Sequence, residues 1–255
     1  MNPIAFYVFG IPIRWYGILI SIGIMIAYFL GSKQSKIYHL DFDEVTDIFI
    51  VALPVSILCA RLYYVIFEWS YYSANPSEIL NIRGGGLAIH GGILGAVISS
   101  YIMCRVKKVD FLSLLDTIAP SFILAQAIGR WGNFFNQEAH GGMVSKEFIS
   151  HFPDFIQKGM FIDGAYYHPT FLYESMWNLI VFAILMILSR KNLEKGSIFY
   201  LYIMLYSVGR FFIEGLRTDS LMLGSLRMAQ VISIIFILLG FTLLIMSNKK
   251  KSHIN

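Results

Sequence analysis

Long apolar stretches alternate with short polar segments along the whole chain. Seven of these stretches have roughly the 20 residues that a helix needs to cross about 30 Å of hydrocarbon. They lie near residues 13–31, 44–67, 86–104, 113–130, 170–189, 197–214 and 227–247. The fourth is the least apolar, because it contains Asp116, Pro120 and Gln126. The pattern predicts an all-α polytopic membrane protein with seven transmembrane helices.

The composition agrees with a membrane protein. Of the 255 residues, 56% are hydrophobic and 14% are charged, whereas soluble domains carry about 25% charged residues. The net charge of +4 does not indicate nucleic acid binding, because the basic residues lie between apolar stretches rather than on one face. Cys59 and Cys104 lie within apolar stretches and are expected to be small buried residues rather than a disulfide. Since the first basic residue is Arg14, we expect no cleavable signal peptide.

Basic residues predict the orientation of the seven helices. Short segments after the first, third, fifth and seventh stretches hold a dense set: Lys33, Lys36, Arg105, Lys107, Lys108, Arg190, Lys191, Lys195, Lys249, Lys250 and Lys251. Such segments remain in the cytoplasm. We therefore expect the N-terminus outside and the C-terminus inside. Residues 132–168 would then form an extracytoplasmic cap, inserted between the fourth and fifth spans of a single membrane-embedded domain covering residues 1–255.

Ionisable residues in a span cost about 2.5–3.5 kcal/mol each on insertion scales and are functional candidates by default. His90 is flanked by glycines where the third span begins. Glycine permits close backbone approach, and histidine is the side chain best suited to proton transfer near neutral pH. The alternative is that these glycines serve helix packing and His90 is a buried residue with its hydrogen bonds satisfied.

A second polar cluster ends the fourth span. Residues 129–141 read Gly-Arg-Trp-Gly-Asn-Phe-Phe-Asn-Gln-Glu-Ala-His-Gly. The guanidinium of Arg130 is suited to bind phosphate through its planar fork of donors. The amides of Asn133 and Asn136 can bind ester or glycerol oxygens. An anchor loop at the membrane interface is the alternative interpretation.

Two further clusters lie at the same predicted level. Tyr206, Arg210, Glu214 and Arg217 are spaced by three or four residues, so they share one face of the sixth helix. This spacing predicts an Arg210–Glu214 pair, which either only joins helices or also orients Arg210 toward an anionic lipid. At the entry to the fifth span, Glu174 would need a buried partner, and we expect a structural role for it.

Taken together, these segments resemble the bacterial prolipoprotein diacylglyceryl transferases over nearly the whole chain. The stretch from Gly129 to Gly141 matches the family signature, Gly-Arg-x-Gly/Ala-Asn-Phe-apolar-Asn-x-Glu-x-x-Gly, at every specified position. Other segments occur in the family's order: Met1-Asn2-Pro3-Ile4, Arg14-Trp15-Tyr16-Gly17, His90-Gly91-Gly92, His168-Pro169 and Arg210…Glu214…Arg217. One departure is Thr218 before Asp219, where many members have proline, and it concerns the local loop shape.

The resemblance implies an enzyme of the bacterial cytoplasmic membrane. It would transfer the diacylglyceryl group of phosphatidylglycerol to the lipobox cysteine of prolipoproteins at the outer leaflet, as the first step of lipoprotein maturation. Arg130 and Arg210 would clamp the phosphate, and His90 would act as general base or bind the headgroup. Tyr206 would be a further catalytic residue that binds the phosphate or the thiol, and Gly141 would permit the turn that returns the loop. The remaining implied site residues bind or orient substrate: Asn133, Asn136, Glu138, Tyr16, Glu214 and Arg217. No metal or organic cofactor is needed for such a displacement.

Two other classes of function compete with this interpretation. A lipid or anion transporter would use the same arginines, but transporter sites usually lie at the membrane midplane, whereas these clusters gather near one end of the spans. A structural membrane protein would not require matched Arg, His and Glu groups at several span ends. The sequence also has no His-Glu-x-x-His metal motif, no phosphate-binding P-loop and no Gly-x-Ser-x-Gly motif.

Overall fold

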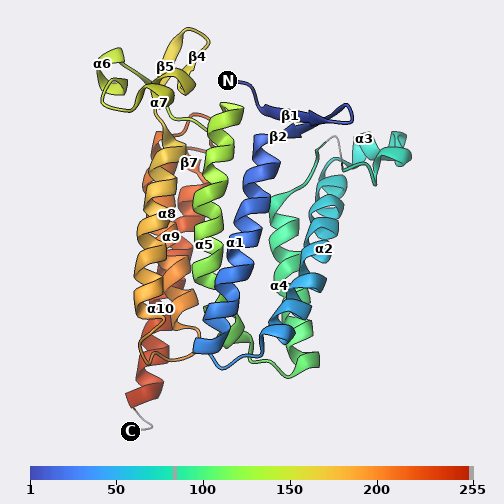
Figure 1. The fold of residues 1–255 in the computed structure, drawn as a ribbon, viewed down its shortest axis with the longest axis vertical. Coiled ribbons are helices and arrows are strands. Elements are labelled where there is room, and N and C mark those ends of the chain that lie inside the picture. Colours follow the sequence, from blue (N-terminus) through green and yellow to red (C-terminus); the bar gives the residue numbers. More distant parts are fainter. Residues whose placement is uncertain (83–84, 253–255) are drawn as a thin grey trace. The chain divides into compact units, whose positions relative to one another are not determined.

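The computed structural model describes residues 1–82 and 85–252, without the side chains of residues 223 and 250–252 (Figure 1). Seven of its helices are long and apolar enough to cross a membrane, as predicted. They are α1 Trp15–Ile37, α2 Phe42–Phe67, α4 Ile89–Lys107, α5 Phe111–Asn136, α8 Thr170–Leu188, α9 Ser197–Leu216 and α10 Met228–Ser252. The protein is therefore a multi-pass helical membrane protein.

One difference from the predicted spans is at the end of the fourth helix. We expected it to end near residue 130, but α5 continues to Asn136. The extra turns carry aromatic rings that pack at the helix end. Phe134 is buried there and contacts Phe171, with ring centroids 4.7 Å apart. The part of the signature from Gly129 to Asn136 therefore lies on this helix.

Short elements that the sequence analysis did not predict join the helices. A hairpin of β1 Ile4–Val8 and β2 Ile11–Arg14 precedes α1. Its two turn residues, Phe9 and Gly10, both have positive φ, as a two-residue hairpin turn requires. The others are α3 Trp69–Ala74, the 3₁₀ turn η1 Pro76–Glu78, and the pair β6 Met222–Leu223 and β7 Leu226–Arg227.

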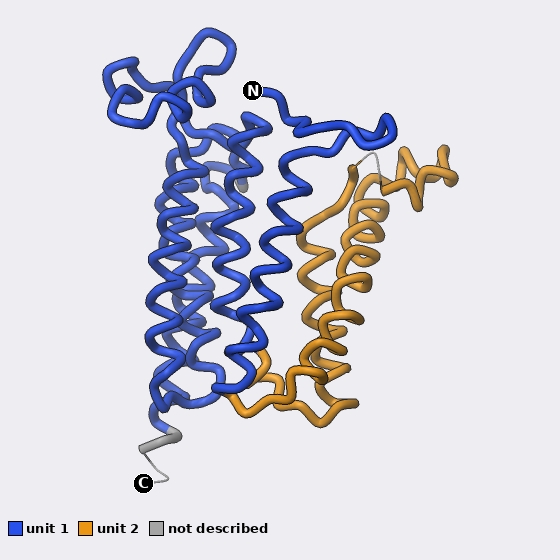
Figure 2. Tube along the Cα trace, in the orientation of Figure 1, with its two compact units in different colours: residues 1–37, 115–255 blue, residues 38–114 orange. Residues whose placement is uncertain are grey.

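The chain divides into two compact units, shown in separate colours in Figure 2. Unit 1 contains residues 1–37 and 115–255, and so includes α1, most of α5, α8, α9 and α10. Several of its helices approach closely: a Cβ on Gly209 of α9 would meet the Trp177 ring of α8 at 2.1 Å. The Trp177 indole also donates to the Leu205 carbonyl at 2.9 Å. Glycine is therefore required where α8 and α9 cross.

The segment between α5 and α8 folds into a small cap. It contains β3 Met143–Val144, α6 Lys146–Ile149, α7 Asp154–Gly159, β4 Phe161–Ile162 and β5 Ala165–Tyr167. The strands form one antiparallel sheet in the order β3-β5-β4. A core holds the cap to the ends of α5 and α8; its buried members are Phe134, Ile149, Ile156, Met160 and Phe171. This core explains how a segment with so little regular structure stays ordered.

Unit 2 contains residues 38–114, with α2 and α4 packed along each other. Gly91 and Gly95 face α2, and a Cβ on either would lie within 2.8 Å of Cys59 atoms. The buried Arg61 of α2 organises the segment before α4. Its guanidinium donates to four backbone carbonyls at 2.6–3.0 Å, those of Glu78, Ile79, Gly85 and Gly86.

Candidate functional site

A buried carboxylate joins the two arginines that the sequence singled out. Glu174 of α8 is 3% exposed. Its Oε1 lies 2.8 Å from Nη2 of Arg130 on α5, and its Oε2 lies 3.3 Å from Nη1 of Arg210 on α9. Three helices of unit 1 thus meet at one ion-pair network.

The predicted pairing along α9 is present. Arg210 Nη2 lies 2.7 Å from Oε2 of Glu214, one turn further along the helix. The Tyr206 hydroxyl, one turn earlier, is 3.5 Å from Glu174 Oε1. Arg210 therefore contacts one carboxylate on its own helix and one on α8. Two fixed partners hold its guanidinium plane in place.

Arg217, just past the end of α9, pairs mainly with Asp219. Its Nε and Nη2 donate to the two Asp219 oxygens at 2.9 and 2.8 Å, while Glu214 lies 4.0 Å away. The hydrogen bond from Arg217 is the main cause that lowers the pKa of the Asp219 carboxyl below its ordinary value. Arg227 donates to the Glu214 carbonyl and, at 2.9 Å, to the Arg217 carbonyl. The turn after α9 is therefore fixed by charged side chains.

The end of the signature forms a compact polar loop. The side-chain amides of Asn133 and Asn136 both donate to Oε1 of Glu138, at 3.0 and 3.3 Å. Gln137 and Ala139 have positive φ, so the chain reverses direction at these two residues. The three predicted headgroup residues thus contact one another, and their role toward a substrate stays a prediction.

Gly141 connects this loop to the end of α9. It forms a bridge with Arg217, and its N–H donates to the His168 carbonyl at 3.0 Å. A Cβ at this position would meet His168 Cβ at 2.6 Å and the Leu216 carbonyl oxygen at 2.9 Å. We expected Gly141 to permit a turn, but positive φ occurs at the residues before it. The structure instead requires glycine for close approach.

The first helix contributes an aromatic side chain. The Tyr16 ring lies against Gly132, where a Cβ would approach it to 2.3 Å. Its neighbour Trp15 stacks on Phe135 with ring centroids 4.9 Å apart. These contacts place Tyr16 of α1 next to the turn of α5 that follows Arg130.

His90 belongs to unit 2, where it lies in the first turn of α4. The side chain is exposed, and its ring centroid is 6.1 Å from that of Tyr63 on α2. The alternative interpretation is therefore wrong in making His90 a buried residue, whereas Gly91 packs against α2 as that interpretation expected. Its role as a base stays a prediction.

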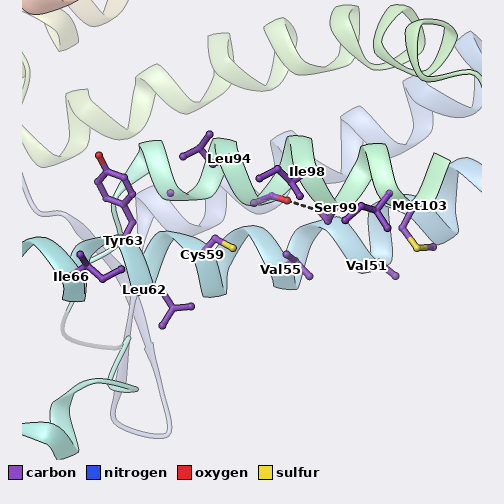
Figure 3. A pocket seen from close by; sticks show the side chains of 13 residues that line it. Val51, Val55, Cys59, Leu62, Tyr63, Ile66, Leu94, Ile98, Ser99 and Met103 are labelled. Atoms are coloured by element: carbon purple, nitrogen blue, oxygen red, sulfur yellow. Dashed lines mark hydrogen bonds between the residues drawn. The ribbon is translucent and has the colours of Figure 1, made fainter. Parts of the chain in front are cut away.

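An apolar cavity of about 490 Å³ also lies in unit 2, between α2 and α4. Figure 3 shows Tyr63 and Ile66 toward one end and Val51 and Met103 toward the other. Its lining contains none of the predicted site residues. Its walls have the apolar character of a surface that contacts hydrocarbon.

The bridging of two arginines by Glu174 was not predicted from the sequence. We expected a structural role and a buried partner for it, and the structure supplies two partners, Arg130 and Arg210. The available signal was the arginine at position 130, since a cation in a span needs a counter-charge.

Arg130 and Arg210 have more donors than the carboxylates of the network use. An arginine has five N–H donors in a fixed fork, and the carboxylates use only some of those of Arg130 and Arg210. Their side chains remain 24% and 19% exposed, whereas that of Glu174 is 4% exposed. Free donors on partly exposed arginines are suited to a phosphate. Among the described residues, no group of three or more His, Cys, Asp or Glu side chains could hold a metal ion.

Comparison with known proteins places this arrangement in a family. Residues 3–246 match the model of the prolipoprotein diacylglyceryl transferase family. A phosphatidylglycerol–prolipoprotein diacylglyceryl transferase of Clostridium novyi (strain NT) is 73% identical over 250 residues, covering 98% of this chain and 97% of that protein. One from Clostridium botulinum (strain 657 / Type Ba4) is 59% identical over 240 residues, covering 94% and 96%. The chain therefore belongs to the prolipoprotein diacylglyceryl transferase family.

Proposed function

We propose that this protein transfers the diacylglyceryl group of phosphatidylglycerol to the sulfur of the lipobox cysteine in prolipoproteins. Family membership supports the reaction class. The observation that carries the proposal to particular residues is the bridge of Arg130 and Arg210 through the buried Glu174. Two guanidinium groups held at one point can bind one lipid phosphate.

Arg130 and Arg210 act as the phosphate clamp. A pair of unit charges 4 Å apart interacts by about 4 kcal/mol at an effective dielectric constant of 20. Glu174 and Glu214 keep both arginines in place before the lipid binds, so little ordering is required at that step. Arg217 and Asp219 extend the network at the end of α9.

The reaction is a displacement at carbon. The thiolate sulfur forms a bond to the carbon of the acylated glycerol that carries the phosphate. The bond between this carbon and the phosphate oxygen breaks, and its electron pair goes to that oxygen. Glycerol phosphate leaves with an additional negative charge, which the two arginines stabilise. The thiol has an ordinary pKa near 8.5, so its proton must go to a base. His90 is our candidate for that base, with binding of the headgroup as the alternative.

The polar loop after Arg130 orients the glycerol headgroup. Asn133 and Asn136 are held by Glu138 at hydrogen-bonding distance, and these amides can also bind hydroxyl groups. Tyr16 and Tyr206 supply hydroxyl groups next to Arg130 and Glu174. Gly141 keeps this loop against the end of α9.

We further propose the orientation that the basic residues predict. The N-terminus and the cap would lie outside and the C-terminus in the cytoplasm, so that the site acts at the outer leaflet. Residues 1–255 would form a single membrane-embedded catalytic domain.

Reconstitution tests the function. The purified protein is placed in liposomes that contain phosphatidylglycerol, and a lipobox peptide is followed by mass spectrometry. We expect a diacylglyceryl mass gain on the cysteine, and none on a matched peptide with serine in its place. A folded protein that modifies no lipobox peptide with any of several lipids would contradict the proposal.

A further inference from the structure

A second layer of polar residues lies one helical turn from the ion-pair network on the same three helices. Gln126, Asn178 and Tyr202 are each four residues from Arg130, Glu174 and Tyr206, on α5, α8 and α9 respectively. The rings of Tyr202 and Tyr206 stack with centroids 6.1 Å apart. Residues four apart lie on the same helix face, so the second layer continues the site.

One donor in this layer is available to a ligand. The Tyr202 hydroxyl donates to Oε1 of Gln126 at 3.3 Å, which turns the amide nitrogen of Gln126 away from that contact. No hydrogen bond to this Nε2 occurs among the residues that the structure describes. Gln126 is partly exposed, whereas Tyr202 is buried. A glutamine inside a span therefore presents an unused N–H donor.

The buried Asn178 shows that this layer is more polar than packing requires. It is fully buried, and neither its Nδ2 nor its Oδ1 has a hydrogen-bond partner within the described part of the chain. An unpaired buried amide is costly. Polar groups retained at such a level call for a role beyond helix packing.

The position of the second layer matches the chemistry of a diacyl lipid. One helical turn is about 5.4 Å along the axis. In phosphatidylglycerol the ester carbonyls follow the phosphate by a few covalent bonds, on the acyl side of the carbon that the sulfur attacks. With the phosphate on Arg130 and Arg210, an ester carbonyl reaches the level of Gln126.

We propose that Gln126 donates a hydrogen bond from Nε2 to an ester carbonyl of the lipid, with Tyr202 fixing the orientation of its amide. This inference rests on the proposed function and adds a specificity determinant to it. The enzyme then distinguishes lipids with ester-linked chains from lipids with ether-linked chains, which have no carbonyl.

A competition experiment tests this inference. Liposomes contain equal amounts of diacyl and dialkyl phosphatidylglycerol with chains of equal length, and the two peptide products are separated by mass. Their ratio does not depend on how much of the enzyme is folded. We expect the wild-type protein to favour the diacyl lipid about fivefold, the effect of one hydrogen bond between neutral groups. Gln126→Leu should abolish the preference, and Tyr202→Phe should reduce it.

Gln34→Leu is the matched control. Gln34 is another glutamine on a long helix of unit 1; it is buried near the C-terminal end of α1 and donates to Met186 Sδ at 2.8 Å. This variant should keep the wild-type ratio. A wild-type enzyme without preference, or a Gln126→Leu variant that retains the preference, would overturn the inference while leaving the proposed function intact. Absence of transfer from both lipids by the wild type would overturn both.

Discussion

Single residues in this site depend on partners that lie far away in the sequence. Glu174 holds Arg130 and Arg210, which come from two other helices. Removing one partner of a buried ion pair typically costs about 3–5 kcal/mol, because it leaves a buried charge unpaired. We therefore expect a substitution of Glu174 to disturb the positions of both arginines.

The close packing around Gly141 can be tested by adding one carbon atom. Gly141→Ala introduces a Cβ that would meet His168 Cβ at 2.6 Å and the Leu216 oxygen at 2.9 Å. We expect the overpacking to destabilise the fold by about 1–3 kcal/mol and to lower transfer activity. Gly142→Ala is the matched control, because a Cβ there meets nothing within 4 Å. Thermal unfolding and transfer rates of both variants check this, and equal behaviour of the two would contradict it.

His168 gives a prediction about pH. Burial lowers the pKa of its imidazole, so below the ordinary value of about 6.5 the unfolded chain binds this proton more readily than the folded protein. Its contribution to stability is therefore complete above about pH 6.5 and is lost as the pH falls toward the lowered pKa. Asp219, whose pKa is also lowered, loses its contribution only below about pH 4.

The measurement is the change in unfolding temperature between pH 7.5 and pH 5.5. We expect His168→Gln to show a smaller change than the wild type, and His151→Gln, at an exposed position of the cap, to resemble the wild type. If the unfolding temperature of His168→Gln changed as much as that of the wild type, His168 would not cause this pH dependence.

Residue types and spacing predicted part of this site. The Arg210–Glu214 pair follows from positions one turn apart on one helix, and the structure contains it. The role of Glu174 could not be predicted, because its partners are determined by how α5, α8 and α9 pack. The close approach that requires Gly141 depends on tertiary structure in the same way.

Helices carry the site residues, so their ends must be fixed as well. At the opposite end of unit 1, Asp116 of α5 accepts hydrogen bonds from the backbone N–H groups of Gly196 and Phe199, at 2.6 and 2.9 Å. These N–H groups belong to the N-cap residue and the first turn of α9, where the N-cap residue supplies no side-chain cap. One carboxylate thus joins the helix of Arg130 to the helix of Arg210.

Replacing Asp116 tests this link between helices. We expect Asp116→Ala to destabilise the protein by about 1–3 kcal/mol, because one buried and one partly buried N–H group lose their acceptor. Asp116→Asn keeps one oxygen acceptor and should be less harmful. Asp154→Asn, at an exposed residue of the first turn of α7, is the control. Unfolding temperatures that are equal for Asp116→Ala and the control would exclude the capping role.

The hydrophobic pattern predicted the number of long helices because burial in a bilayer requires length and apolarity alone. It could not predict the end of α5 or the fold of the cap. Both depend on aromatic side chains that pack across segments, as Phe134 and Phe171 do. The β1–β2 hairpin was missed for another reason: residues 4–13 are uncharged and precede a span directly, so they resemble a continuation of it.

At the scale of the whole molecule, orientation is the next quantity to measure. In a protein without Cys59 and Cys104, single cysteines are introduced as Lys146→Cys in the cap and Lys191→Cys between α8 and α9. A membrane-impermeant maleimide should label residue 146 in intact cells and residue 191 only after the membrane is opened. The reverse pattern would contradict the proposed topology.

The measurement that tests the account most directly is transfer by variants of the ion-pair network. Arg130→Lys, Arg210→Lys and Glu174→Gln are each reconstituted with phosphatidylglycerol and a lipobox peptide, and their folding is checked by thermal unfolding. Lysine lacks the planar fork of donors, and Glu174→Gln removes the carboxylate that holds both arginines. We therefore expect each folded variant to transfer at least about tenfold more slowly than the wild type. Glu147→Gln in the cap is the control and should keep the wild-type rate. Folded variants that retain the full rate would show that the phosphate is bound elsewhere.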